Sequence, residues 1–473
     1  MLAVPLVLAC LAAAGAELRL TALVSDHAVL QHDCALRLAG RAAPGERLEL
    51  LLDGTQQGEA CSADADGRFE LALRTGAPGG PHTLVVRGAS EVRVEDVFFG
   101  EVWLCAGEIE MEQQHQDVLE IGQAAEPGSP DAAPRVPELR LFDIGDAFSP
   151  APCERCVGRW RTTTRANLAE FSAVAFRFAR ELQRELRVPV GVIVAAAGGS
   201  HAESWVGARG LRSFPGFAPY LERMAKAAAD PKAPEARMAF SQDWPSALFN
   251  GMIAPLDGLG FAGVLWDQGE SNRGQAQQYG ALLQALIRDW REHFAAPELP
   301  FVVVQLPDMH VPTQSAGIPL VREAQARALA LPATALVVTL DLGRQTRGSS
   351  PVQAELARRA ARVALAHVYG RSALEVDGPR LRAASFEGAR VRITLERPRG
   401  LHPLEGQPTG FVLAGADRRF RPAEARVEGE CVVVHSDAVP APVAVRYAWA
   451  DRTGANLVDQ DGLPLAPYRS DEW

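Results

Sequence analysis

The sequence lacks the short signatures that mark a metal, nucleotide or dinucleotide cofactor. It contains no HExxH pair for zinc, no Walker loop for phosphates and no GxGxxG turn for a dinucleotide. It also lacks an excess of positive charge, since 58 acidic residues outnumber 48 basic ones and the formal net charge is -10. We therefore expect no cofactor, no metal site and no nucleic-acid partner.

Long apolar runs are missing as well, apart from the N-terminus. Residues 1–16 are apolar but too short to span a bilayer, and Ala14-Gly15-Ala16 fits a signal-peptide cleavage site. No other segment is long enough to cross a membrane. We interpret residues 1–16 as a signal peptide and predict a secreted or periplasmic protein without a membrane span.

Cysteines are few, and six remain after the expected cleavage. An oxidising compartment would allow disulfides, and the Cys153-Glu154-Arg155-Cys156 segment is a candidate local bridge. A single CxxC without a second pair is weak evidence for zinc. The six are Cys34, Cys61, Cys105, Cys153, Cys156 and Cys431.

Residues 17–95 are typical of a small antiparallel β-domain. Short stretches there alternate apolar with polar residues, and Asp-Gly and Pro-Gly turns separate them. The expected strands are Leu18–Leu20, Ala35–Gly40, Arg47–Leu52 and Phe69–Leu73.

The pattern changes near residue 96. Apolar runs that suit strands buried on both faces alternate with helical patterns, which predicts a parallel, doubly wound α/β sheet. Residues 123–134 and 225–233 predict surface loops. The expected strands are Pro189–Ala195, Ala262–Trp266, Phe301–Leu306 and Ala335–Leu340, and the expected helices are Ala173–Glu185, Ala276–Phe294, Leu320–Ala330 and Val352–Val368.

Strands return after about residue 374. They are expected at Ala389–Leu395, Gly410–Leu413, Cys431–His435 and Val443–Trp449. The chain is long enough for two or three domains. We predict an N-terminal β-domain at 17–95, an α/β domain at 96–372 and a C-terminal β-domain at 373–473.

Four segments follow expected strands of the α/β domain. Ligands of such sheets bind beyond the carboxyl ends of the strands. In the first segment, the turn after Gly107 carries no hydroxyl and no thiol, but Glu108, Ile109 and Glu110. The second has a glycine turn whose backbone N–H groups suit an oxyanion. These and the remaining two segments are Phe98–Met111, Ala197–Trp205, Trp266–Asn272, and Asp341–Arg344 with Gly348–Pro351.

These segments resemble the sialate O-acetylesterase family, within the SGNH hydrolase superfamily. The resemblance covers nearly the whole mature chain. It implies a three-layer α/β/α domain flanked by β-domains and acting on acetylated sugars, sialic acids among them. The motifs that carry it are GEVWLC-G at Gly100–Gly107, FSAVAF-FARELQ at Phe171–Gln183, GGS-AESW at Gly198–Trp205, PSALFNGMIAPL at Pro245–Leu256, W-QGESN at Trp266–Asn272 and VREAQ at Val321–Gln325.

The resemblance fails at the positions of the family's catalytic triad. The family motif GQSNM carries the nucleophilic serine, and Ile109 stands in its place here. The family motif D-x-H-P completes the triad, and this chain has Gly348 for the aspartate and Ser350 for the histidine. An isoleucine cannot attack a carbonyl, so the resemblance implies a site without its usual chemistry.

One hypothesis is a glycoside hydrolase that uses carboxylates. Such enzymes place two carboxyl groups about 5–5.5 Å apart for retention or about 6.5–9.5 Å apart for inversion. We pair Glu108 or Glu110 with Glu270 in this role. Asp267, His201 and His115 are further candidates.

A second hypothesis, of similar weight, is a pseudoesterase that only binds glycans. Trp205, Trp266, Gln268 and Asn272 would recognise a sugar by stacking and hydrogen bonds, together with the turn at Gly199, Ser200 and His201. His310 follows a strand end and Arg344 suits a sugar carboxylate, as in sialic acid. The expected partner is a glycan under either hypothesis.

A third hypothesis keeps esterase activity with a displaced nucleophile, such as Ser200 beside His201. Neighbouring residues in one loop rarely orient as a nucleophile and its base, so this hypothesis stands last.

Overall fold

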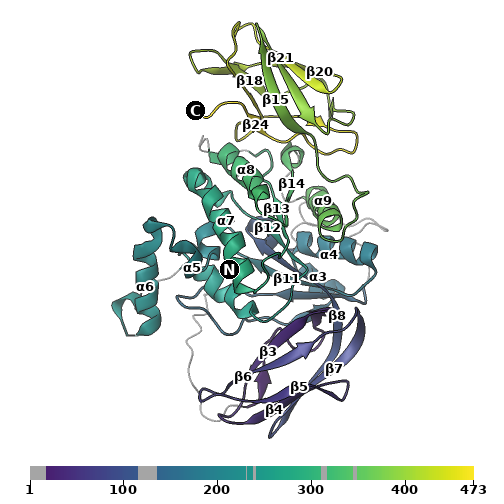
Figure 1. Ribbon diagram of the computed structural model, residues 1–473, viewed down its shortest axis with the longest axis vertical. Helices are drawn as coiled ribbons and strands as arrows, with labels where there is room; N and C mark the ends of the chain where they lie inside the picture. The colour runs from purple at the N-terminus through teal and green to yellow at the C-terminus, as the bar shows by residue number, and fades with distance from the viewer. Residues whose placement is uncertain (1–16, 116–135, 231, 238–240, 310–316, 345–348) are drawn as a thin grey trace. The chain divides into compact units, whose positions relative to one another are not determined.

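The computed structural model describes residues 17–473 apart from 116–135, 231, 238–240, 310–316 and 345–348. The chain divides into two compact units, one within Met1–Asp267 and Gln284–Phe301, the other within Gln268–Leu283 and Val302–Trp473 (Figure 1). The expected signal peptide and the loop expected at 123–134 lie outside the described residues. No described helix is long and apolar enough to cross a membrane.

The N-terminal strands belong to the first unit. β6 (Arg68–Arg74) alternates exposed and buried residues and pairs with β3 (Ala35–Arg41), as their sequences predict. β8 (Glu91–Gly107) is continuous: its first half pairs with β7 (Gly79–Arg87) and its second half with the central sheet. The predicted boundary between residues 95 and 96 falls inside this strand. The other strands are β1 (Arg19–Leu20), β2 (Val29–Gln31), β4 (Arg47–Leu52) and β5 (Thr55–Ser62).

The central sheet of the first unit confirms the predicted α/β class. Its strands lie in the order β10 (Trp160–Thr162), β9 (Leu139–Asp143), β11 (Val190–Ala196), β8 and β12 (Gly263–Asp267). The last four are parallel, and β10 is an antiparallel edge strand. Every residue of β11 and β12 is buried, as their continuous apolar runs predict.

Helix α4 (Ala173–Leu186) packs on this sheet and is fixed at both ends. The Ser172 side chain accepts a hydrogen bond from the backbone N–H of Ala175, and Arg187 ends the helix in the left-handed conformation. The other helices of this unit are α1 (Ile109–Glu112), α3 (Arg165–Ala169), η2 (Ala202–Trp205), α5 (Ala208–Leu211), η3 (Pro215–Phe217), α6 (Ala218–Ala229), η4 (Pro234–Arg237), η5 (Phe249–Ile253) and η6 (Ala254–Leu256).

The second unit begins with strand and helix elements that the sequence predicts. Helix α7 (Ala276–His293) is divided between the two units. Strand β13 begins at Phe301, where the first unit ends along the chain. The remaining elements of this part are η7 (Ser271–Gln275), β13 (Phe301–Val304), α8 (Gly317–Arg327), η8 (Ala328–Ala330), β14 (Thr334–Val337), η9 (Leu340–Arg344) and α9 (Ser350–His367).

The C-terminal strands of the second unit form two four-stranded antiparallel sheets, β15-β16-β21-β20 and β19-β18-β22-β24. Apolar residues of both sheets share one core, including Ile393, Val432, Leu413 and Tyr447. β17 pairs with β23. The bounds are β15 (Arg380–Glu387), β16 (Arg390–Glu396), β17 (His402–Pro403), β18 (Phe411–Ala414), β19 (Phe420–Pro422), β20 (Glu424–Glu428), β21 (Cys431–His435), β22 (Ala444–Tyr447), β23 (Leu457–Val458) and β24 (Tyr468–Arg469).

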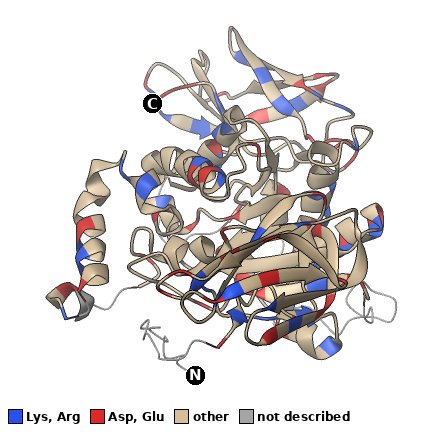
Figure 2. Cartoon of the chain, turned by 60° about the horizontal axis from the view of Figure 1, so that its bottom comes forward, with Lys and Arg blue, Asp and Glu red and all other residues tan. Residues whose placement is uncertain are grey.

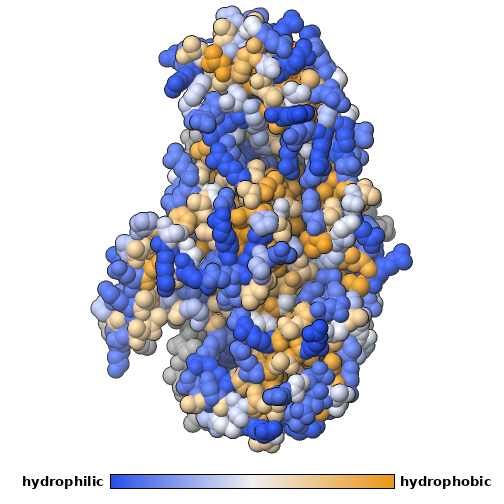
Figure 3. All heavy atoms as spheres, in the orientation of Figure 1, coloured by the Kyte–Doolittle hydropathy of each residue, from blue (hydrophilic) through white to orange (hydrophobic). Residues whose placement is uncertain are grey.

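Surface charges of the two signs are mixed. Figure 2 shows Lys and Arg interspersed with Asp and Glu along the N-terminal strands. On the face drawn in Figure 3, hydrophobic residues occur in small groups between hydrophilic ones. The six described cysteines carry free thiols, so the candidate bridge between Cys153 and Cys156 is not formed.

Candidate functional site

The turn after β8 is held by the backbone of β12. Gly107 adopts a φ of +146°, and a Cβ there would lie 1.9 Å from the carbonyl oxygen of Asp267, so only glycine fits. The N–H of Glu108 donates to the same oxygen at 2.9 Å, and α1 winds from that point. Ile109 is the first residue of α1 and half of it is exposed (50%), whereas Met111 is buried. The turn thus presents a hydrocarbon side chain at the carboxyl edge of β8.

The turn after β11 is closed by a carboxylate of α1. The Oε2 of Glu112 accepts a hydrogen bond from the backbone N–H of Gly198 at 2.6 Å. The Nε2 of Gln242 donates to the carbonyl oxygen of Gly198 at 2.8 Å. Gly199 is exposed and left-handed, with a φ of +76°. The sequence predicts that the N–H groups of this glycine turn bind an oxyanion. In the structure, one of them is bound to a side chain of the protein itself.

Ser200 lies in this turn but faces inward. It is fully buried; its Oγ donates to the carbonyl oxygen of Ala197 at 2.7 Å and accepts from the indole N–H of Trp205 at 2.9 Å. These bonds fix the turn on η2. A hydroxyl held in this way is not presented to a substrate.

His201 is better placed for contact with a ligand. Its Nδ1 lies 3.2 Å from the Oδ1 of Asp243, and both side chains are partly exposed. The pair gives the first unit an imidazole whose orientation is set by a carboxylate.

Three carboxyl groups act on one another near the ends of β9 and α1. Burial raises the pKa of Asp143 to about 6; Arg161 works against this effect, and Asp146 and Glu112 add repulsion. Burial also raises the pKa of Glu112, although its hydrogen bond from Gly198 opposes the change. The pKa of Asp146 is raised by burial. These acids therefore keep their protons to a higher pH than ordinary surface carboxyl groups.

The two tryptophans predicted to stack on a sugar are core residues. Trp205 and Trp266 are both 0% exposed and meet edge to face, with ring centroids 5.8 Å apart. Trp290 packs on Trp266 at 5.6 Å and donates its indole N–H to the carbonyl oxygen of Trp205. Their rings are covered by protein, which argues against the predicted role in stacking.

The polar residues of the QGESN segment are also structural. In the second unit, the Nε2 of Gln268 donates to the Oδ1 of Asn272 at 2.8 Å, and both residues are buried. Tyr279 and Gln325 donate to the carbonyl oxygen of Gln268, each at 2.9 Å. The predicted contact of Gln268 and Asn272 with substrate is not supported, because both side chains are buried and hydrogen-bonded to each other. Glu270 remains partly exposed just before η7.

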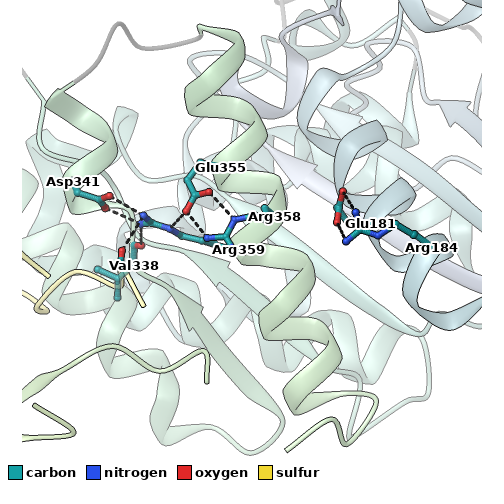
Figure 4. A network of polar contacts seen from close by, with 8 residues as sticks. Glu181, Arg184, Val338, Asp341, Glu355, Arg358 and Arg359 are labelled. Atoms are coloured by element: carbon teal, nitrogen blue, oxygen red, sulfur yellow. Dashed lines mark hydrogen bonds and ion pairs between the residues drawn. The ribbon is translucent and has the colours of Figure 1, made fainter. Parts of the chain in front are cut away.

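The fourth segment is anchored by a buried ion pair, again within the second unit. Both carboxylate oxygens of Asp341 accept from the guanidinium of Arg359, each at 2.7 Å, and Glu355 and the carbonyl oxygen of Val338 complete the network (Figure 4). Ser350 is the first residue of α9. Arg344 ends η9, while His310 and Gly348 lie outside the described residues.

The predicted catalytic acids of the first unit differ in exposure. Glu108 is buried, whereas Glu110 is partly exposed on α1. His115 and Asp267 are buried too. Across the described residues, no group of three or more His, Cys, Asp and Glu side chains is arranged to hold a metal ion.

Known proteins resemble the chain along most of its length. The family model for a carbohydrate esterase, sialic acid-specific acetylesterase, matches residues 161–366. The crystal structure of a carbohydrate acetylesterase from Xanthomonas citri matches with a TM-score of 0.82 and 33% identity, over 97% of this chain and 100% of that one. The chain belongs to the sialate O-acetylesterase-like carbohydrate esterase family. Human sialate O-acetylesterase is 29% identical over 379 residues, which cover 72% of this chain and 68% of the human protein.

Membership in this carbohydrate esterase family confirms the predicted resemblance. Several ionisable residues near the site were not predicted from the sequence, namely Glu112, Asp143, Asp146 and Asp243. Glu112 follows Glu110 by two residues and could have been found as part of the same helical turn. The three aspartates lie near the turn only through tertiary packing, and β9 itself was not predicted.

Proposed function

We propose that this chain is a glycan-binding member of the family that does not hydrolyse acetyl esters. The observation that carries the proposal is Ile109, half exposed at the start of α1, where the family motif has its serine. A hydrocarbon side chain has no lone pair to attack a carbonyl carbon. The proposed loss of the triad extends to Gly348 and Ser350 in the fourth segment.

The bond between Glu112 and Gly198 supports this proposal. An oxyanion hole needs N–H donors that are free to meet the charge that develops in the transition state. Here a carboxylate holds the N–H of Gly198 at 2.6 Å and brings negative charge of its own. The arrangement would repel an oxyanion rather than stabilise it.

The displaced-nucleophile hypothesis has less support. The Oγ of Ser200 is buried, donates to the carbonyl oxygen of Ala197 and accepts from the indole N–H of Trp205. Removal of Ser200 should therefore disturb the turn rather than a reaction.

The expected ligand is an acetylated or sialylated glycan. The backbone of Gly199 and the pair of His201 and Asp243 are exposed polar groups of the first unit that suit such a ligand. An imidazole and a carboxylate suit hydrogen bonds to sugar hydroxyl or amide groups.

The test measures binding and turnover on the same sample of full-length protein. The probe is N-acetyl-9-O-acetylneuraminic acid; calorimetry records binding, and an enzymatic assay records released acetate. We expect binding that weakens about tenfold in His201→Ala, because one oriented hydrogen bond is lost, and no acetate release. Acetate release by the wild type, or no binding at all, would refute the proposal.

Glycoside hydrolysis is a second candidate, because one carboxyl group has the pKa that a general acid needs. The pKa of Asp143 is raised to about 6, and the Glu112 carboxyl group contributes to the rise. A raised acid beside a second carboxylate is the pattern that such enzymes use. Among the acids predicted from sequence, Glu108 and Glu110 of the first unit stay candidates for the partner role.

A panel of 4-nitrophenyl glycosides, 4-nitrophenyl sialoside included, tests this candidate. Hydrolysis by the wild type that disappears in Asp143→Asn and in Glu112→Gln would support it. No release of nitrophenol from any substrate between pH 4 and pH 7 would exclude it for this panel.

We also propose that the protein is secreted or periplasmic, on the basis of residues 1–16. Expression of the full chain in a bacterium with a periplasm, followed by mass spectrometry of the intact protein, tests this. The proposal expects a product that begins at Glu17. A product that keeps residues 1–16 would contradict it.

A further inference from the structure

A groove lies on the C-terminal β-region of the second unit, which is yellow in Figure 1. It encloses about 1210 Å³ of space that includes open solvent. Its walls come from the segment that leads into β18, from the end of β19 with the start of β20, and from the loop after β22. It shares no residue with the carboxyl edge described above, so the inference does not rest on the proposed function.

The lining combines an apolar surface with a few polar groups. Val412 and Pro422 are opposite each other in neighbouring strands, and Trp449 also lines the groove. Gln407, Thr409 and Arg452 add polar groups at the rim. This mixture is typical of sites that bind small ligands.

Buried polar side chains lock the loops that form the groove. The Nδ2 of Asn456, which is 2% exposed, donates to the carbonyl oxygens of Glu405 and Gln407 at 2.8 and 2.9 Å. Asp308, which is 3% exposed, accepts from the N–H groups of Thr453 and Gly454, each at 2.8 Å. The walls are therefore pre-organised, which lowers the entropic cost of binding.

Two arginines contact the ring of Trp449. The guanidinium of Arg469 lies 5.0 Å from the ring centroid, and two hydrogen bonds of 3.0 Å join it to the carboxylate of Glu323 on α8. Arg446 lies 5.9 Å from the same ring and is paired with Asp471. Both arginines are thus neutralised while they hold an aromatic surface in place.

Arg452 is the charged group left for a ligand. It is exposed and makes no hydrogen bond or ion pair with another residue of the described chain. Glu424 on the opposite wall is 3.6 Å from His435, and its side chain is 86% exposed, so water screens its charge. An uncommitted guanidinium beside a fixed aromatic ring suits a ligand with both an apolar ring face and a carboxylate.

From these contacts we propose that the groove binds an acidic sugar of a glycan chain. The pyranose ring lies against Trp449 and Val412, and its carboxylate pairs with Arg452. The rim groups of Gln407 and Thr409 reach the sugar hydroxyls.

The test compares 3′-sialyllactose with lactose, because only the first carries a carboxylate. Calorimetry on the full chain is expected to show about tenfold tighter binding of 3′-sialyllactose, which corresponds to one charged hydrogen-bonded pair. Arg452→Gln should remove this preference, and Trp449→Ala should weaken the binding of both sugars about tenfold. Arg426→Gln, an exposed arginine of β20 outside the groove, is the matched control and should change neither affinity.

Two outcomes would overturn the proposal. One is the same affinity for 3′-sialyllactose in Arg452→Gln as in the wild type, and the other is no binding of 3′-sialyllactose by the wild type. Arg452→Gln decides the matter alone if Trp449→Ala does not fold. A loss of binding in His201→Ala with full binding in Arg452→Gln would overturn this proposal and leave the proposed function intact.

Discussion

The turn after β8 and the QGESN segment both come from motifs of the same family, yet they use their polar residues differently. Around Gln268, the amide and carbonyl groups bond to Asn272, Tyr279 and Gln325 in a buried network. After β8, Ile109 and Glu112 of α1 are exposed, whereas Met111 between them is buried. In this chain the motif around Gln268 therefore holds the fold, whereas the turn after β8 presents Ile109 and Glu112 to solvent.

The largest loss of stability should come from replacing a buried residue of a family motif. Trp266→Ala removes a ring that is 0% exposed, and the cavity should lower the free energy of unfolding by about 3–5 kcal/mol. Urea denaturation measures this loss, and Tyr220→Ala, on an exposed tyrosine, should cost less than about 1 kcal/mol. A stable Trp266→Ala protein with weakened glycan binding would show that Trp266 serves the ligand and not the fold.

An intermediate effect is expected at the anchor of the fourth segment. Asp341→Asn breaks the pair with Arg359, whose side chain is 6% exposed, and should cost about 2–3 kcal/mol. Arg184 in Figure 4 pairs with Glu181 on the surface of α4, so Arg184→Gln should cost at most about 0.5 kcal/mol. Equal losses in the two variants, measured by thermal or urea unfolding, would mean that the Asp341 pair does not anchor the segment.

A smaller effect should appear in the pH dependence of stability. Because the folded state raises the pKa of Asp143 to about 6, it keeps a proton that the unfolded chain releases near pH 4. The free energy of unfolding should therefore fall as the pH rises from about 4 to about 6, by about 1–2 kcal/mol once partial exposure is allowed for. In Asp143→Asn, the free energy of unfolding should not show this decrease with pH. An identical fall in the variant, measured by urea denaturation across the pH range, would assign it to other groups.

Much of the fold follows from local patterns. The buried runs at β11 and β12 and the helices α4, α7, α8 and α9 were predicted because apolar periodicity is a local property. Strand β9 was not predicted, because Arg140 interrupts its apolar pattern. In the structure this arginine is buried, and its guanidinium donates to the carboxylate of Asp96 at 3.0 Å. The prediction of a loop at 225–233 is wrong for residues 225–229, because the alanines there continue helix α6.

The site was less predictable than the fold. The position of Ile109 followed from the motif, but the bond from Gly198 to Glu112 and the pair of His201 and Asp243 depend on the tertiary structure. The role of the tryptophans was misjudged for the same reason. A ring near a strand end suggests a sugar platform, and only the packing of Trp205 on Trp266 and Trp290 reveals a core.

The most direct test of the account restores the family's triad. The variant combines Ile109→Ser, Gly348→Asp and Ser350→His, and Glu112→Gln is added to weaken the hold on the N–H of Gly198. Acetate release from N-acetyl-9-O-acetylneuraminic acid is measured for this variant and for the wild type. We predict no release by the wild type and measurable release by the restored protein. Turnover by the wild type that Ile109→Gly leaves unchanged would contradict it.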